Sequence, residues 1–319
     1  DSPEKWIGKN LEEIVNYRLN LVRGIQKTGI EDTGSRFVES LHELAMSSGS
    51  IDSEVKFLKN PAPIPSIDGQ NAPFGPIGEI KSAKFSPNSS IKPIERAYYD
   101  TDLKAEDAVM KLYNSGIEIS KIQKCFSIGM FGKNRKLVPT KWSITATDQI
   151  ISNELMLDIL NFDILDQFLV FHFDHLGNIF SVILFPHRWL FEMQEAWHDK
   201  NSIGFGSDYE NAKGIDHPPT IAGAYFAGKL AVAEYLEKIQ KQSGVMIFRE
   251  IQPEYAVPVG VWQVREGIRE AMKSSPQEVF SLNDAIDLAT KRMSISKNEW
   301  LSHGKMLKLI EQTSMSDFF

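Results

Sequence analysis

The spacing of apolar residues along the chain predicts several helices and a few short strands. Apolar side chains recur every three or four positions in many stretches, which is the spacing of one helix face. The predicted helices cover residues 3–25, 37–45, 103–115, 141–160, 189–197, 220–241, 261–272 and 281–291, with a last helix after residue 296. Runs of β-branched and aromatic residues predict strands at 168–173, 179–185 and 245–251, the first two joined as a hairpin.

Two stretches lack such a pattern. Residues 59–93 contain many prolines and glycines, which predict an irregular segment that wraps over the body, with one or two short edge strands. Residues 199–217 are polar and rich in glycine, which is typical of a loop. We therefore expect a mixed α/β (α+β) fold, with a modest mixed β-sheet flanked by many helices. Residues 1–311 are expected to form a single globular domain, followed by a flexible tail over 312–319.

The tail has the pattern of the short peptides that dock on sliding DNA clamps. Gln312 is followed by Met315 three positions later and by Phe318 and Phe319 at the end. One tight helical turn would place the three apolar side chains on one side as a plug, with the Gln312 amide behind them. The alternative is that these residues close a terminal helix onto the protein's own core.

The overall charge makes the tail more informative. The net charge is −7 over 319 residues, so the whole chain is not a general nucleic-acid binder, and any DNA contact needs a local basic patch. A tail that binds a clamp would bring this acidic protein to DNA without a strong DNA contact of its own. A single cysteine, Cys125, excludes an internal disulfide, and no apolar run is long enough to span a bilayer. We expect a cytoplasmic protein without membrane contact, associated with the nucleoid through the clamp.

One basic segment stands out in this acidic chain. It runs from Gly132 into the helix predicted at 141–160, and its side chains with backbone N–H groups at a helix start would suit a phosphate. A solvated basic turn is the alternative. The candidate phosphate or nucleic-acid contacts are Lys133, Asn134, Arg135, Lys136, Thr140, Lys141, Trp142 and Ser143, together with Arg249 and Arg265 near the end of a strand.

Four acids are candidates for general acid or base chemistry, namely Asp148, Glu192, Glu210 and Glu250. Solvated or structural carboxylates are the alternative for each. The run His172-Phe173-Asp174-His175 suggests a metal site only at first sight, because a strand places His172 and His175 on opposite faces. We therefore predict no metal site, and the sequence assigns no cofactor.

Several stretches together resemble the archaeal Nre DNA-repair protein family. The most specific is KNRKLVPTKWSITA at 133–146. The others are DSPEKW at 1–6, YRLNLVRG at 17–24, GAYFAGKLAV at 223–232, FREI at 248–251 and PVGVWQVRE at 258–266. The resemblance implies a role in DNA repair and recruitment by the sliding clamp PCNA through a C-terminal PIP-type peptide, whose key positions match Gln312, Met315, Phe318 and Phe319. Family members often carry a zinc finger in additional N-terminal sequence, but Cys125 is the only cysteine here, so no zinc site is carried over.

Three functions remain open for the body of the protein. The first is a clamp-recruited repair factor that recognises or processes damaged or modified DNA. The second is a hydrolase or transferase that acts on a nucleotide-like group, such as a modified base or an ADP-ribose adduct. The third is a non-enzymatic repair adaptor in which the polar clusters are structural.

Overall fold

The chain forms two compact units, which are described separately below. The computed structural model describes residues 2–62, 73–86, 88–199 and 202–310. Unit 1 contains residues 1–151 and 257–260, and unit 2 contains residues 152–256 and 261–319. The sequence pattern did not indicate this division. The four clamp-binding positions of the tail lie outside the described residues.

Unit 1 combines short helices with a three-stranded sheet. Its helices are η1 (Pro3–Lys5), α1 (Leu11–Leu19), α2 (Arg36–Met46), α3 (Lys92–Tyr99), α4 (Ala105–Asn114), α5 (Ile119–Ser127) and the first part of α6 (Thr140–Ile159). The strands β1 (Arg23–Ile25), β2 (Asp52–Phe57) and β3 (Ile77–Ser86) form a sheet in the order β1-β3-β2. The ten-residue β3 pairs in parallel with β1 and antiparallel with β2.

Two predictions for unit 1 are wrong. Residues 77–86, expected to be irregular apart from short edge strands, form the central strand of this sheet. The helix predicted at 3–25 is broken, because Gly8 adopts φ +82° and residues 23–25 pair with β3 instead of continuing α1. Just before the C-terminus of α1, the Arg18 guanidinium donates to the carbonyl of Val259 at 2.7 Å. This contact joins the beginning of unit 1 to its distant segment 257–260.

Unit 2 is built on a six-stranded mixed sheet. Its strands are β5 (Phe168–His175), β6 (Asn178–Phe185), β7 (Leu190–Asp199), β8 (Ser202–Asn211), β10 (Gly244–Ile251) and β11 (Gln277–Val279), in the order β11-β5-β6-β10-β7-β8. The central pair β10 and β7 is parallel, and the other pairs are antiparallel. A separate small pair joins β4 (Asp163–Ile164) to β9 (Lys241–Gln242).

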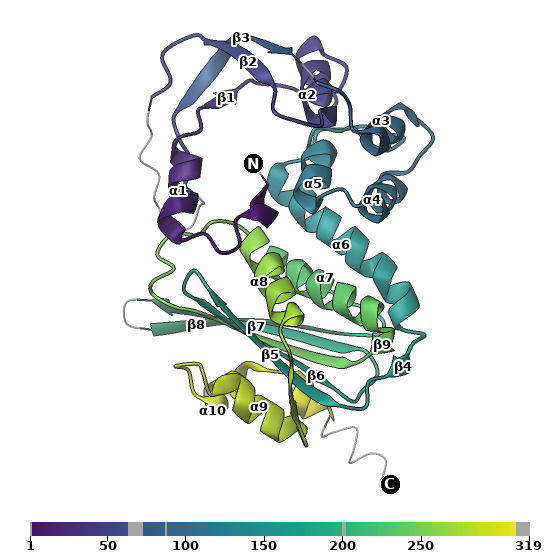
Figure 1. Cartoon of the computed structure of the whole chain (residues 1–319), viewed down its shortest axis with the longest axis vertical. Coiled ribbons are helices and arrows are strands. Elements are labelled where there is room, and N and C mark those ends of the chain that lie inside the picture. Colours follow the sequence, from purple (N-terminus) through teal and green to yellow (C-terminus); the bar gives the residue numbers. More distant parts are fainter. Residues whose placement is uncertain (1, 63–72, 87, 200–201, 311–319) are drawn as a thin grey trace. The chain divides into compact units, whose positions relative to one another are not determined.

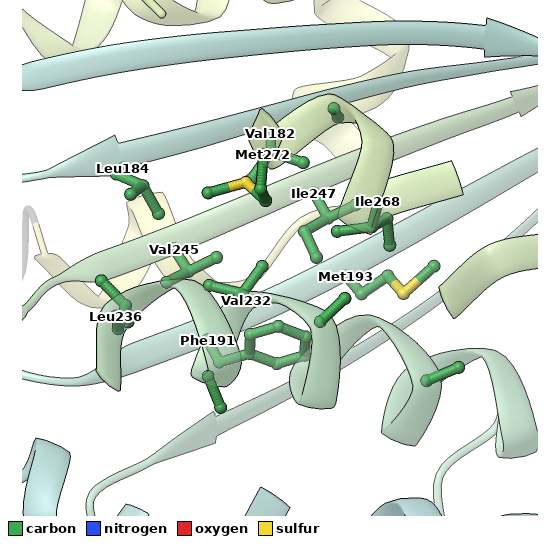
Figure 2. Close-up of a cluster of buried hydrophobic side chains, with 14 of the residues drawn as sticks. Val182, Leu184, Phe191, Met193, Val232, Leu236, Val245, Ile247, Ile268 and Met272 are labelled. Carbon is green, nitrogen blue, oxygen red and sulfur yellow. The ribbon is translucent and has the colours of Figure 1, made fainter. Parts of the chain in front are cut away.

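Helices cover both faces of this sheet (Figure 1). Helices α7 (Ala222–Ile239) and α8 (Trp262–Lys273) lie on one face, and α9 (Leu282–Thr290) and α10 (Lys297–His303) lie on the other. Figure 2 shows the apolar cluster between the sheet and α7 and α8, where Val232 and Leu236 of α7 approach Val245 and Ile247 of β10. The predicted mixed α/β fold is thus confirmed. No helix among the described residues has both the length and the apolar character needed to cross a membrane.

Two predictions for unit 2 are also wrong. Nearly all of the predicted helix 189–197 belongs to β7, which covers residues 190–199. Residues 202–211, within the predicted loop 199–217, form β8. Both faces of β7 are buried because helices cover both sides of the sheet, so the strand lacks the simple apolar–polar alternation of a half-exposed one. In contrast, the predicted hairpin β5–β6 is confirmed. The predicted last helix is also present as α10, and Ser296 and Glu299 form a capping box at its start.

Candidate functional site

The basic segment forms a loop between α5 and α6 whose backbone is fixed while most of its charges stay exposed. The Leu137 amide donates to the carbonyl of Ile30 at 2.8 Å, and the Val138 amide donates to Ser127 at 2.8 Å. Lys133, Asn134, Lys136 and Lys141 are exposed. These backbone hydrogen bonds therefore anchor the loop to unit 1, while most of its basic side chains stay exposed.

Two of the basic side chains already have partners. The Arg135 guanidinium donates to the Tyr98 carbonyl and lies over the Tyr98 ring, 4.9 Å from its centroid. The Lys136 ammonium lies 2.8 Å from the Glu31 carboxylate in an exposed ion pair. Exposed pairs of this kind contribute little and are easily exchanged for another anion. Lys133 and Lys141 are therefore the cations of this segment that are most open to a phosphate.

A cavity of 440 Å³ lies beside this segment. Its polar and aromatic lining consists of Lys104, Phe126, Phe131, Lys133, Asn134 and Lys136. Aromatic rings beside lysines suit a flat base next to a phosphate. The sequence did not indicate Lys104 and the two phenylalanines, because they precede the basic segment along the chain and only the fold brings them to the same cavity.

The start of α6 contributes an exposed aromatic residue. Trp142 is 68% exposed, beside the exposed Lys141. Large exposed aromatics next to cations are typical of surfaces that stack unpaired bases. Ser143, in contrast, is fully buried and donates its hydroxyl to the Thr140 carbonyl at 2.9 Å. The hydroxyl of Ser143 therefore completes the first turn of the helix.

Arg249 and Arg265 belong to unit 2 and are buried there. The Arg249 guanidinium contacts the Glu195 carboxylate and donates to Asn178 Oδ1 at 2.9 Å and to Gln263 Oε1 at 3.2 Å. Arg265 is also buried, and its Nε lies 3.2 Å from Glu266 Oε1. Each arginine thus has a neighbouring carboxylate. Among the candidate phosphate contacts, the exposed ones belong to the segment in unit 1.

The structure does not gather the four candidate acids into one site. Asp148 is buried in unit 1 and accepts from Gln123 Nε2 at 3.2 Å. In unit 2, Glu210 faces α7, whereas Glu192 and Glu250 contact residues after α9 on the other face of the sheet. None of the four lines the cavity beside the basic segment.

Glu210 is the centre of a buried cluster on the α7 face. Its carboxylate accepts from Trp189 Nε1 at 2.9 Å, from the Tyr225 hydroxyl at 2.6 Å and from the Lys229 ammonium at 2.8 Å. Burial, followed by the nearby Glu210 charge, raises the pKa of Tyr225, so its phenol stays protonated and donates. These contacts tie β8 and the residue just before β7 to α7.

Glu250 has a similar number of partners on the other face. Its carboxylate accepts from Gln252 Nε2 at 2.6 Å and from the backbone amide of Ser294 at 3.0 Å, and it lies 2.9 Å from His198 Nε2. Ser294 Oγ lies 3.2 Å from the same His198 nitrogen. A nucleophilic triad needs the acid and the hydroxyl on opposite ring nitrogens. This arrangement therefore holds the connection between α9 and α10 onto the sheet.

Glu192 fixes the segment after α10. Its carboxylate accepts from the backbone amides of Lys305 at 2.6 Å and Met306 at 3.3 Å. Burial raises the pKa of Glu192, and these two amide contacts act in the opposite direction. A carboxylate at the first amides of a helical turn stabilises that turn.

His172 and Asp174 of β5 contact neighbouring side chains, and the single cysteine is buried. His172 Nδ1 lies 2.9 Å from Ser181 Oγ, and Asp174 pairs with Arg292 at 2.5 Å. Across the described parts of the chain, no group of three or more His, Cys, Asp and Glu residues is arranged to hold a metal ion. Cys125 is fully buried, and burial raises the pKa of its thiol to about 12.

Comparison with known proteins covers nearly the whole chain. Residues 1–203 match the family model described as Archaeal Nre, N-terminal, and residues 210–318 match the one described as Archaeal Nre, C-terminal. The boundary between these matches lies within β8 and differs from the boundary between the two compact units.

Three relatives are similar over nearly the full length of this chain. The Archaeoglobus fulgidus protein named DNA repair protein NreB is 33% identical, over 100% of this chain and 83% of its own. The protein of the same organism named DNA repair protein NreA is 34% identical, over 100% of this chain and 81% of its own. The Haloferax volcanii protein named DNA repair protein NreA is 29% identical, over 98% and 78% respectively. No solved structure matches the chain.

Proposed function

Because the chain belongs to the archaeal Nre family, we propose that it is a DNA-repair factor that a sliding clamp recruits through residues 312–319. The observation that carries the repair role is the match of the entire chain to relatives named DNA repair proteins. The clamp is supported by the pattern of Gln312, Met315, Phe318 and Phe319. The body would then recognise or process damaged or modified DNA at the site to which the clamp brings it.

The clamp peptide can be tested by calorimetric titration of the full chain with PCNA. The affinity should be near micromolar, or about −8 kcal/mol, since each buried aromatic contributes about 1.5–3 kcal/mol and ordering the tail offsets part of that gain. Phe318→Ala with Phe319→Ala should abolish measurable binding. Ser316→Ala, at a position outside the pattern, is the matched control and should bind normally. Unchanged binding of the double variant would contradict the clamp proposal.

The exposed part of the basic segment is proposed to contact DNA. Lys133 and Lys141 carry the open charges, and Trp142 offers a surface for an unpaired base. Because the net charge is −7, this contact should be weak without the clamp. A clamp raises the local concentration to roughly millimolar, which would compensate for that weakness.

Anisotropy titrations with a fluorescent single strand at several salt concentrations test this contact. Lys133→Gln with Lys141→Gln should weaken binding and make the salt slope shallower by about 1.4, because each released phosphate contact contributes about 0.7 on single strands. Trp142→Ala should weaken binding to the single strand more than to a duplex, since loss of stacking costs about 1–3 kcal/mol per base. Lys84→Gln, an exposed lysine on β3, is the control. An unaltered salt slope in the double lysine variant would remove the basic segment from the DNA-binding surface.

A further inference from the structure

The cavity of 440 Å³ beside the basic segment combines aromatic and polar lining residues. Its aromatic residues are Phe126, in the last turn of α5, and Phe131, and its exposed polar residues include Lys104, Lys133 and Asn134. Phe131 is only 4% exposed, whereas Phe126 is only partly buried, so Phe126 is the ring that offers surface to a ligand. The volume lies within the range of small-molecule sites.

A glycine brings the polar residues of the lining together. Gly132 adopts φ +97°, a conformation that side chains rarely allow. A Cβ added at Gly132 would lie 3.3 Å from the Cβ of Ala105, so the loop passes closely against the first residue of α4. Lys133 and Asn134 directly follow this glycine, and Lys104 directly precedes Ala105. Backbone packing between the loop and α4 therefore places all three polar side chains at one cavity.

The polar groups of this lining are open to a ligand. The lining residues include three lysines and no acid among the described parts of the chain, although the net charge of the whole chain is −7. Lys136 is paired with Glu31, but the ammonium groups of Lys104 and Lys133 and the amide of Asn134 have no partner among the described residues. The two ammonium groups suit phosphate oxygens, and the amide can both donate and accept.

We propose that this cavity takes up one unpaired base of a DNA strand. The ring of Phe126 stacks on the base, the amide of Asn134 bonds to its edge, and Lys104 and Lys133 hold the neighbouring phosphates. The cost of removing a base from the stack is smallest where the base already lacks a complementary partner, so the ligand is DNA with an unpaired or mismatched base. This inference rests on the proposed repair function and specifies the feature of damaged DNA that the body recognises.

Anisotropy titrations of the full chain with three fluorescent duplexes test the proposal. The first duplex is fully paired, the second carries one bulged adenine, and the third carries an abasic residue in place of that adenine. The second and third duplexes share the bulged backbone and differ only in the base. We expect the bulged adenine to bind about 5- to 100-fold more tightly than the abasic bulge, which is the range for stacking of one base on an aromatic ring.

Variants then connect this preference to the cavity. Phe126→Leu keeps an apolar side chain on α5 and removes the ring, so it should reduce the advantage of the bulged adenine at least about threefold and leave affinity for the abasic bulge unchanged. Asn134→Ala changes an exposed residue without a described partner, so it should fold normally and reduce the same advantage by about threefold or more. Lys84→Gln, on β3, is the control, with no change expected.

Equal affinity for the bulged adenine and the abasic bulge would overturn the proposal, as would an advantage that survives both Phe126→Leu and Asn134→Ala. An advantage that is lost in Trp142→Ala but kept in both cavity variants would place the base on Trp142 and would also overturn it. These outcomes are distinct from a failure of the basic segment as a DNA contact. Lys133→Gln with Lys141→Gln should lower affinity for all three duplexes, whereas the cavity variants should leave the salt slope unaltered.

Discussion

The buried pair between Lys229 and Glu210 allows a sharp test of how unit 2 is held together. The Lys229 ammonium lies 2.8 Å from the Glu210 carboxylate, and the side chains are 5% and 1% exposed. Replacing Lys229 with Met keeps the apolar stem of the side chain and removes its charge. The carboxylate would then remain buried with only the neutral donors Trp189 and Tyr225.

The expected loss of stability follows from that contact list. Breaking a buried ion pair by removing one partner costs about 3–5 kcal/mol, because it leaves a charge without compensation. Since the two neutral donors remain, we expect Lys229→Met to fall near the lower value, at about 3 kcal/mol. The double variant Glu210→Gln with Lys229→Met removes both charges and retains an amide oxygen for Tyr225 or Trp189. The double variant should therefore be more stable than Lys229→Met alone, and less stable than the parent, which keeps the ion pair between Lys229 and Glu210.

Urea denaturation followed by tryptophan fluorescence and by circular dichroism measures these differences. With an m-value of about 3 kcal/mol/M, a loss of about 3 kcal/mol moves the midpoint by about 1 M. The control is Lys273→Met, whose ammonium lies 2.6 Å from Glu270 on a side chain that is 69% exposed. That exposed pair should contribute less than about 1 kcal/mol despite its shorter distance.

Two results would refute this reasoning. The first is a loss in Lys229→Met no larger than that in Lys273→Met, which would mean that burial does not determine the strength of the pair. The second is a double variant whose loss equals the sum of the two single losses, because residues in one network should show a coupling free energy.

Three further predictions concern packing, pH and helix capping. In Gly244→Ala the new Cβ would lie 2.2 Å from the buried ring of Phe185, so the free energy of unfolding should fall by about 1–3 kcal/mol in urea denaturation. The control is Gly34→Ala, whose Cβ would meet no atom within 4 Å and should change that free energy by less than about 0.5 kcal/mol. Burial lowers the pKa of His42, so the unfolded chain takes up a proton at a higher pH than the folded chain. The stability that neutral His42 contributes is present above pH of about 6.5 and is lost as the pH falls. His42→Gln should therefore show a smaller drop in urea midpoint than the parent between neutral and mildly acidic pH. Ser296→Ala removes the side chain that accepts from the Glu299 amide, so it should cost about 1 kcal/mol in the same assay, and no loss would contradict the capping assignment.

The sequence predicted the helices better than the sheet for physical reasons that particular residues illustrate. Helix α7 carries small and apolar residues at helical spacing, and Ser296 with Glu299 marks the start of α10 directly, because both signals are local. β7 was predicted as a helix because both of its faces are buried, which obscures the period of a strand. Its identity depends on pairing with β10 and β8, which no local pattern encodes.

The residues of the candidate site could likewise be predicted only in part from the sequence. The exposed lysines of the basic segment could be recognised from the sequence because they lie within nine residues of one another, at 133–141. The partners of Glu210 could not, since Trp189, Tyr225 and Lys229 reach it from two other segments.

The contact between Arg18 and Val259 has a consequence for how the protein is made. Unit 1 includes residues 257–260, so its last piece leaves the ribosome only after residues 152–256 of unit 2 have already been synthesised. Domains usually fold in the order of their synthesis, with the N-terminal one first. Here the N-terminal unit lacks one of its own contacts until most of the second unit has emerged, so the nascent chain should acquire its final protease resistance in both units late in translation, at nearly the same time.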